Sequence, residues 1–231
     1  KNKINGDCVA LFDEGGNEAK TLSDSGYAFF SKTPFYAESG GQVGDQGSIS
    51  NDNLEIFVSD CKKVGDFNMH KVKIQKGEIN VGDKVSLSIN EERRNKIVNN
   101  HSATHLLHSA LREVLGDKVQ QKGSLVNDEK LRFDFSHGKK LTSEQIEQVE
   151  DLVNMRIEDA IDTKIDVKSF DDAIKDGALA FFGDKYGDKV RVLTIGGDFS
   201  VELCGGTHVK NTSEIEGFII SNETSVSAGV R

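Results

Sequence analysis

The sequence predicts an α+β fold: a small β-barrel-like unit over residues 1–89, followed over residues 90–231 by a mostly antiparallel sheet packed with two long helices. Two observations predict it. Short β-rich runs separated by turn residues fill the first part of the chain, and near Asn90 the spacing of apolar residues changes from a strand period to a helical period. The 231 residues suffice for one large domain or two small ones.

The barrel-like unit is predicted from five short runs rich in β-branched and aromatic residues. They are Cys8–Phe12, Gly26–Phe30, Leu54–Val58, Met69–Ile74 and Lys84–Ile89. Clusters of Gly, Asn and Asp separate them, as expected of turns between strands. Several short strands at this spacing indicate a small barrel.

The second part opens with a helical pattern over Glu91–Leu115, which predicts one broken helix or two helices ending before Gly116. Another long helix is expected over Thr142–Ile161, with Ser143 as its N-cap. The remaining expected elements are a hairpin of Gly123–Val126 and Leu131–Phe135, strands over Thr163–Phe170, Lys189–Ile195, Phe199–Leu203 and Gly217–Ser221, and a short helix with a glycine-punctuated loop over Ala173–Gly187.

Composition narrows the class of protein. The net charge of −9 disfavours a protein that grips a long nucleic-acid backbone over its whole surface, and leaves local basic patches as the alternative. No apolar run approaches the roughly 20 residues needed to span a bilayer, and the N-terminus has no signal-peptide pattern. Three cysteines without a spacing pattern argue against a disulfide framework, so a reducing compartment, the cytoplasm, is expected.

Two pairs of candidate metal ligands lie far apart in the sequence. His101 and His105 are spaced i,i+4, so both imidazoles leave one face of a helix about one turn apart. Cys204 and His208 lie in a glycine-containing run after a strand-like segment. Because a thiolate and three imidazoles are a suitable ligand set for Zn²⁺, the four residues together predict one metal site.

The other histidines have ordinary interpretations. His108 falls near the same helix face and is expected to pack beside the ligands or to support them from behind. His70 and His137 have no ligand-like neighbours and are expected to be ordinary surface or strand residues. In Thr33–Asp45, Gly40-Gly41 allows close approach of a ligand, although this stretch taken alone favours a plain loop between two strands. In Gln120–Val126, a glutamine beside a Lys-Gly turn is compatible equally with a hydrogen bond to a substrate and with a solvated edge.

Taken together and in this order, the motifs resemble the editing region of alanyl-tRNA synthetase and its free-standing relatives. The segments that carry the resemblance are Thr33–Asp45, Arg93–Arg94 leading to Asn100–His108, Gln121–Val126, Leu131–His137, Gly177–Asp188 and Cys204–Val209. The editing domain of threonyl-tRNA synthetase is similar in fold and metal pair but lacks the Cys-Gly-Gly-Thr-His run. Ser213–Gly217 departs from the Thr-Gly-acidic-Ile-Gly turn usual in the family.

The resemblance implies hydrolysis of the ester that joins serine or glycine to tRNA(Ala), at a zinc site held by His101, His105, Cys204 and His208. Gln121 and Thr33 are the candidates for contacting the serine hydroxyl, and the backbone amides of Gly205 and Gly206 for stabilising the oxyanion. Zinc would either lower the pKa of a water toward about 7 or orient the substrate for a separate water, and the sequence leaves both open.

The expected partner is the 3′ end and acceptor stem of tRNA(Ala), attracted by basic residues. These are Arg93, Arg94, Lys122, Lys185 and Arg191. The chain is expected to be a fragment whose aminoacylation and C-terminal domains lie elsewhere in a full-length synthetase. Two other classes remain: a metal-stapled module that binds tRNA without catalysis, and a zinc hydrolase of small esters or amides that has no need of tRNA.

Overall fold

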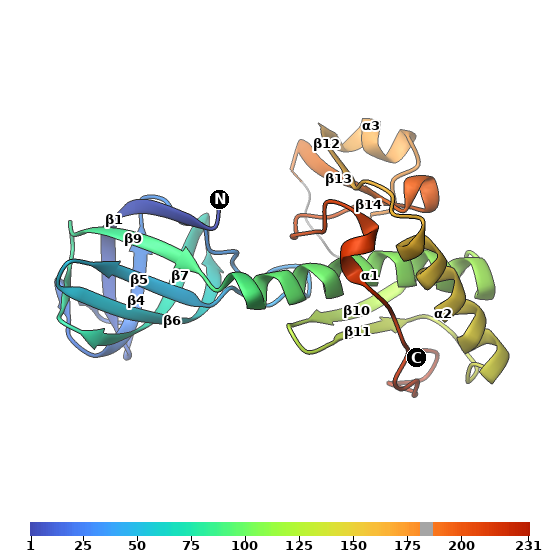
Figure 1. Ribbon diagram of the computed structural model, residues 1–231, viewed down its shortest axis with the longest axis horizontal. Coiled ribbons are helices and arrows are strands. Elements are labelled where there is room, and N and C mark those ends of the chain that lie inside the picture. The colour runs from blue at the N-terminus through green and yellow to red at the C-terminus, as the bar shows by residue number, and fades with distance from the viewer. Residues whose placement is uncertain (181–186) are drawn as a thin grey trace. The chain divides into compact units, whose positions relative to one another are not determined.

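In the computed structural model, which describes residues 1–180 and 187–231, six strands of the N-terminal part close into an antiparallel barrel (Figure 1). Their order around the ring is β1-β4-β7-β6-β5-β9, and β9 pairs again with β1. The barrel strands are β1 (Lys3–Asp13), β4 (Ser25–Phe30), β5 (Gly47–Asn51), β6 (Leu54–Val64), β7 (Phe67–Lys76) and β9 (Lys84–Ile89). Short strands β2 (Glu18–Ala19), β3 (Thr21–Leu22) and β8 (Ile79–Asn80) complete this part.

Alternation of buried and exposed residues explains the barrel. In β4 and β9 every second side chain is buried, so one face of each strand lines a common apolar core. The predicted barrel is therefore confirmed, and each of the five predicted runs lies in one of its strands. Strand β5 has no clear pattern in the sequence, because Gly47–Asn51 is mostly polar and contributes one fully buried apolar side chain, Ile49.

The described chain divides into two compact units. Unit 1 comprises Lys1–Ser39 and Val43–Asn95, and unit 2 comprises Gly40–Gln42 and Lys96–Arg231. Each unit has its own hydrophobic core, so each can be understood separately.

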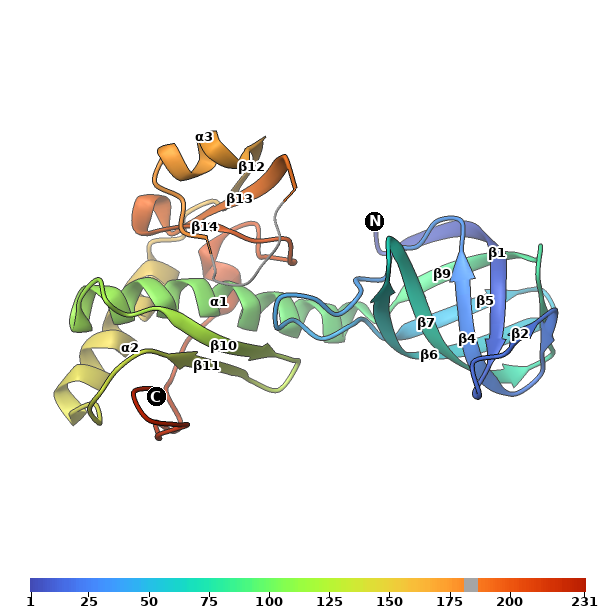
Figure 2. The same ribbon diagram turned by 180° about the vertical axis from the view of Figure 1, so that it is seen from behind.

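Unit 2 is built around α1 (Glu91–Leu115), a single helix and not two. From residue 96 onward this helix lies between a hairpin and a three-stranded antiparallel sheet (Figures 1 and 2). The hairpin consists of β10 (Gln121–Val126) and β11 (Leu131–Phe135), and the sheet of β12 (Lys164–Ser169), β13 (Lys189–Ile195) and β14 (Ser200–Leu203). The expectation of one mostly antiparallel sheet is corrected: the strands are antiparallel but form two separate sheets.

Local hydrogen bonds set the helix starts. Helix α2 (Ser143–Glu158) is capped by Thr142 instead of Ser143: the Thr142 hydroxyl accepts from the Gln145 N–H, and the Gln145 side chain accepts from the Thr142 N–H. Helix α3 (Phe170–Lys175) starts earlier than predicted because Ser169 caps it through the Asp172 N–H. Two short 3₁₀ turns, η1 (Gly197–Phe199) and η2 (Thr212–Ile215), flank β14 and the loop after it.

The strand expected over Gly217–Ser221 is absent from the described structure. This extended segment binds side chains of α2 instead of another strand: the Phe218 N–H donates to Asn154 Oδ1 and the Ile220 N–H to Glu150 Oε1. Within the described ranges, no helix combines the length and the apolar character needed to cross a bilayer.

Candidate metal centre

The four predicted ligands come together in unit 2. One ligand atom from each of His101, His105, Cys204 and His208 lies within 4.8 Å of the others, and the two helix histidines are buried. Helix α1 places His101 and His105 one turn apart with stacked rings whose centroids are 5.2 Å apart. Cys204 directly follows β14, and the loop after it returns His208 to the thiol.

The distances from the Cys204 sulfur to two of the imidazole nitrogens are close to those of a tetrahedral zinc. Cys204 Sγ lies 3.5 Å from His101 Nε2 and 3.2 Å from His208 Nε2. Zn–N and Zn–S bonds of about 2.1 and 2.3 Å in a tetrahedron put the two donor atoms about 3.6 Å apart. His105 Nε2 is buried and has no hydrogen-bond partner among the described residues, as expected of a nitrogen reserved for a cation.

A buried carboxylate orients two of the histidines. Glu202, which is 1% exposed on β14, accepts hydrogen bonds from Nδ1 of His105 and, at 2.5 Å, from Nδ1 of His108. Since a carboxylate only accepts, His105 must carry a proton on Nδ1, which turns Nε2 toward the other ligands. His108 therefore shares a carboxylate partner with His105, a contact compatible with support of the ligands from behind, one of its two expected roles.

Two acidic groups of this cluster, Glu202 and Cys204, interact with the charge on His105. Burial raises the pKa of Glu202, but the charge on His105 and hydrogen bonds from both histidines lower it to about 2. Burial likewise opposes the Cys204 thiolate, yet the charge on His105 and hydrogen bonds from the imidazoles hold the pKa of that thiol well below its ordinary value. Two buried negative charges therefore face His105, and they raise its pKa to about 10 although burial lowers it.

His208 has the opposite electrostatic environment. Burial lowers its pKa to about 3, although the Cys204 thiolate partly opposes the shift. A neutral imidazole keeps a lone pair for a metal, so His208 is in the state that ligation requires.

Gly206 shapes the loop between Cys204 and His208. A Cβ at this position would lie 2.2 Å from His101 Cε1, so only glycine lets the backbone approach the ring. The Gly206 N–H donates to Cys204 Sγ at 3.4 Å, and its carbonyl accepts from Arg191 Nη1 at 2.6 Å. Further along, the Val209 N–H donates to Ser102 Oγ on α1 at 3.0 Å, which fastens the loop to the helix.

The other predicted site residues lie in several places. In unit 2, Gln121 is half-buried at the start of β10, Lys122 beside it is exposed, and Arg191 on β13 holds the carbonyl of Gly206. The Gly206 N–H, a candidate oxyanion donor, is directed at the Cys204 thiolate. Lys185 lies outside the described residues.

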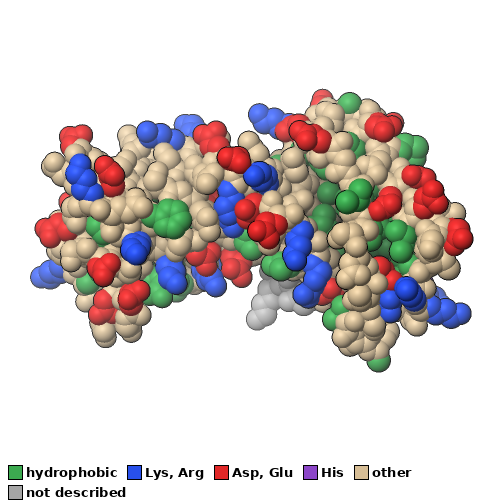
Figure 3. Space-filling model, turned by 60° about the horizontal axis from the view of Figure 1, so that its bottom comes forward, with side chains coloured by type: hydrophobic (Ala, Val, Ile, Leu, Met, Phe, Trp, Pro, Cys, Tyr) green, Lys and Arg blue, Asp and Glu red, His purple; other side chains and the backbone are tan. Residues whose placement is uncertain are grey.

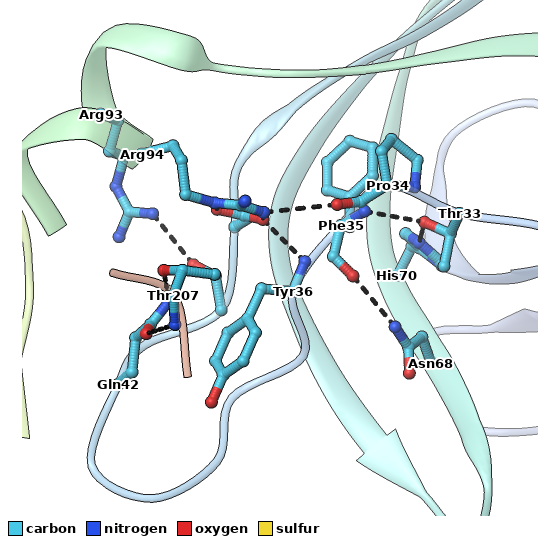
Figure 4. A network of polar contacts seen from close by, with 12 residues as sticks. Thr33, Pro34, Phe35, Tyr36, Gln42, Asn68, His70, Arg93, Arg94 and Thr207 are labelled. Atoms are coloured by element: carbon cyan, nitrogen blue, oxygen red, sulfur yellow. Dashed lines mark hydrogen bonds and ion pairs between the residues drawn. The ribbon is translucent and has the colours of Figure 1, made fainter. Parts of the chain in front are cut away.

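In unit 1, both arginines bind the chain that follows the barrel strand β4 (Figure 4). Arg93 donates to the carbonyl of Gly44 at 2.9 Å. Arg94 forms a double hydrogen bond with the carboxylate of Asp45, whose side chain is 2% exposed, and also donates to the carbonyl of Pro34. Arg94 therefore has a structural partner in addition to any role with tRNA.

His70 lies on a strand, as one of its two interpretations held, but it is fully buried instead of on the surface. Its Nδ1 bonds the carbonyl of Ala28 at 3.1 Å, so Nδ1 carries the proton and Nε2 accepts from Thr33 Oγ1 at 2.7 Å (Figure 4). The Thr33 oxygen in turn accepts from the Phe35 N–H. The hydroxyl proton of Thr33 is committed to His70, which leaves one lone pair on its oxygen.

Sequence reasoning missed two residues of the centre, Gln42 and Glu202. Gln42 is fully buried and its Oε1 lies 2.7 Å from His101 Nδ1. A signal existed for Glu202: an acidic residue in an apolar strand, two positions before a candidate ligand, seldom lacks a buried partner. Nothing in the local sequence marks Gln42, because its partners are more than 50 residues away.

Comparison with known families first identifies the class. Residues 1–93 match the family of class II (A) tRNA synthetases, and residues 190–231, which include Cys204 and His208, match the threonyl and alanyl tRNA synthetase second additional domain. His101 and His105 lie outside both matched ranges.

Relatives that match most of this chain narrow the class further. The chain is 54% identical over 199 residues to the alanine–tRNA ligase of Thermoanaerobacter sp. (strain X514), covering 86% of this chain and 23% of that protein. It is 51% identical to the alanine–tRNA ligase of Sulfurovum sp. (strain NBC37-1) and 50% identical to that of Cupriavidus necator, each over 225 residues, 96% of this chain and 26% of the relative. The chain thus spans about a quarter of the length of these relatives, and the comparisons support a segment of an alanine–tRNA ligase.

Proposed function

We propose that this chain hydrolyses the ester of Ser-tRNA(Ala) and Gly-tRNA(Ala), as the editing segment of an alanine–tRNA ligase. The observation that carries the proposal is the convergence of His101, His105, Cys204 and His208, two of them in the region that matches the second additional domain. Their donor spacing, the thiolate and the oriented imidazoles fit Zn²⁺.

Zn²⁺ bound by these four residues would supply Lewis-acid chemistry to an ester and its attacking water. The chain itself does the positioning: Glu202 fixes the ring of His105, and the Gly206 N–H stabilises the Cys204 thiolate. Since that contact engages Gly206, we assign the oxyanion role to the Gly205 N–H, with the Gly206 N–H secondary.

Selection for serine follows from hydrogen bonding. An aminoacylation pocket built for alanine cannot exclude glycine and rejects an added hydroxyl only weakly, so a second hydrolytic site is needed. The two candidates for the serine hydroxyl contact are Gln121 in unit 2, whose amide both donates and accepts, and Thr33 in unit 1, whose oxygen can still accept. Alanine would leave such polar groups unpaired, which disfavours it.

Recognition of the tRNA 3′ end and acceptor stem is proposed to use local charges. Basic and acidic side chains are interspersed on the face drawn in Figure 3, in keeping with the net charge of −9. We therefore expect weak binding by Arg93, Arg94, Lys122, Lys185 and Arg191, assisted by the aminoacylation and C-terminal domains of a full-length ligase. Neutralising these residues should lower both tRNA affinity and its salt dependence, by a slope of about 0.7–0.9 per lost phosphate contact. An unchanged slope would contradict the assignment.

The ligand count favours a second candidate function. Four protein ligands close a tetrahedral zinc, which is the arrangement of structural sites, whereas catalytic sites keep one position open. A metal-stapled module that binds tRNA(Ala) without chemistry would have this arrangement.

Deacylation distinguishes the two candidates. Wild type and Cys204→Ala, matched for fold by circular dichroism, are incubated with Ser-tRNA(Ala), and with Ala-tRNA(Ala) as control. Release of serine but not alanine by wild type, lost in Cys204→Ala, is the expected result. Binding of tRNA(Ala) without release of serine, also when the domains that flank this segment in a full-length ligase are present, would favour the binding module.

A further inference from the structure

Gln42 reaches the metal centre from a short, rigidly held segment. Gly40–Gln42 belongs to unit 2, and the Val126 N–H of β10 donates to the carbonyl of Gly41 at 2.8 Å. Gly41 has φ +84°, and a Cβ there would lie 2.7 Å from the carbonyl oxygen of Ser124. The backbone at Gln42 is therefore fixed by close packing on β10, and its side chain is fully buried.

The amide of Gln42 makes three hydrogen bonds, which together determine its orientation. Gln42 Nε2 donates to Thr207 Oγ1 at 2.8 Å, and Gln42 Oε1 accepts from the Thr207 N–H at 3.0 Å (Figure 4). A backbone N–H only donates, so the atom facing it must be the oxygen of the amide. The same oxygen lies 2.7 Å from His101 Nδ1.

This orientation decides the tautomer of His101. Because an amide oxygen only accepts, Nδ1 of His101 must carry the proton. The lone pair is then on Nε2, the nitrogen that lies 3.5 Å from Cys204 Sγ. One amide thus connects the helix half of the centre, through His101, to the loop half, through Thr207.

We propose that Gln42 is a positioning residue of the metal centre, which sets the tautomer and ring orientation of His101 and holds the Cys204–His208 loop in register with α1. The role parallels that of Glu202 toward His105, with a neutral amide in place of a carboxylate. It rests on the metal centre proposed above and not on the hydrolysis of Ser-tRNA(Ala).

If Gln42 has a role in packing alone, the expected results differ from those of a role in positioning His101. If Gln42 only fills space and satisfies Thr207, its replacement alters stability without altering metal affinity. If it positions His101, the acceptor oxygen is what matters. Glutamate keeps an acceptor for His101 Nδ1 and for the Thr207 N–H, and the Thr207 hydroxyl can rotate to donate to its second oxygen.

The test is a Co²⁺ titration of the full chain, followed by the thiolate-to-metal absorption band and by competition with a chelator. The variants are Gln42→Leu and Gln42→Glu, and Gln148→Leu on the exposed face of α2 serves as the control. We expect Gln42→Leu to bind Co²⁺ about 10- to 100-fold more weakly than wild type. Gln42→Glu and the control should stay within about threefold, a span of less than 1 kcal/mol. Equal affinity of Gln42→Leu and wild type, or an equal loss in Gln42→Glu, would overturn the proposal.

A second measurement needs no metal and covers the case in which Gln42→Leu does not fold. The imidazole ¹⁵N shifts of His101 in the metal-free wild type should report the proton on Nδ1, and a proton on Nε2 would overturn the proposal. Failure of wild type to bind Co²⁺ would refute the metal centre and this role with it. Co²⁺ binding without release of serine would refute only the proposed hydrolysis.

Discussion

Replacing Gly206 with alanine should damage the metal centre, whereas the same change at the adjacent glycine should not. The two positions form a matched pair. A Cβ at Gly205 would meet none of the described atoms within 4 Å, but at Gly206 it would lie 2.2 Å from His101 Cε1, 2.5 Å from His101 Nδ1 and 2.9 Å from Gln42 Oε1. The sequence assigns both glycines to the site for their N–H groups, and the structure distinguishes them by what their missing side chains would contact.

The size of the effect follows from these distances. To restore an ordinary contact of at least 3.4 Å, the ring of His101 or the loop must move by about 1.2 Å. Metal–ligand distances tolerate only about 0.2 Å, so His101 can no longer ligate in the original geometry. We expect a loss of metal affinity of at least about 100-fold, the upper end of what a displaced supporting residue costs, together with about 1–3 kcal/mol of metal-free stability from overpacking.

The assay is Zn²⁺ affinity by chelator competition, beside urea unfolding of the metal-free chain. Gly205→Ala should match wild type in affinity and be equal or slightly higher in stability, since alanine lowers the entropy of the unfolded chain. Affinity of Gly206→Ala within threefold of wild type would refute the reasoning, as would an equal loss in Gly205→Ala.

Three further results are expected. Burial lowers the pKa of His70 to about 4, from a value near 6.5 in the unfolded chain, so the unfolded chain takes up a proton first as the pH falls. The contribution of neutral His70 to stability is therefore fully present above pH 6.5. About 3 kcal/mol of it is lost as the pH falls toward 4. Urea unfolding across this range should show a steeper pH dependence for wild type than for His70→Asn, and parallel curves would contradict it. Arg94→Ala should lose about 3–5 kcal/mol because it leaves the carboxylate of Asp45 buried without its partner, and the added change Asp45→Asn should restore part of this; an unchanged urea midpoint in Arg94→Ala would exclude a structural role. For wild type at a Zn²⁺ concentration 100 times the Kd, removal of the metal by a chelator should lower the free energy of unfolding by about 2.7 kcal/mol. The unfolding free energy of Cys204→Ala should be insensitive to chelator.

Sequence pattern is most informative where a residue's role depends on near neighbours. In the barrel strands β4 and β9 every second side chain is buried over six residues, so their period of two is visible in the amino-acid sequence alone. The histidine pair on α1 is visible for the same reason, since helix geometry alone places His101 and His105 on one face. Local pattern fails for Gly217–Ser221, because an apolar extended segment looks like a strand whether its N–H groups bind a strand or, as here, side chains of α2.

The supporting residues of the metal centre depend on contacts between distant segments. Gln42 contacts residues 59 and 165 positions away, and no short-range pattern specifies such partners. The convergence of the two ligand pairs can be inferred from their chemistry, because a thiolate and three imidazoles suit one metal. The roles of Gln121, Thr33 and the basic residues remain predictions, since they depend on a bound tRNA.

The 103 positions between His101 and Cys204 also impose an order of events during synthesis. At roughly 5–20 residues per second, α1 is made about 5–20 s before the thiol that joins its histidines. The reactive sulfur therefore emerges only after the helix that lowers its pKa has had time to form, and closing the loop onto α1 is a late, long-range step. Until that step the Cys204 thiol lacks the imidazoles that lower its pKa, so it stays mostly protonated, which limits its oxidation and its capture by the wrong metal.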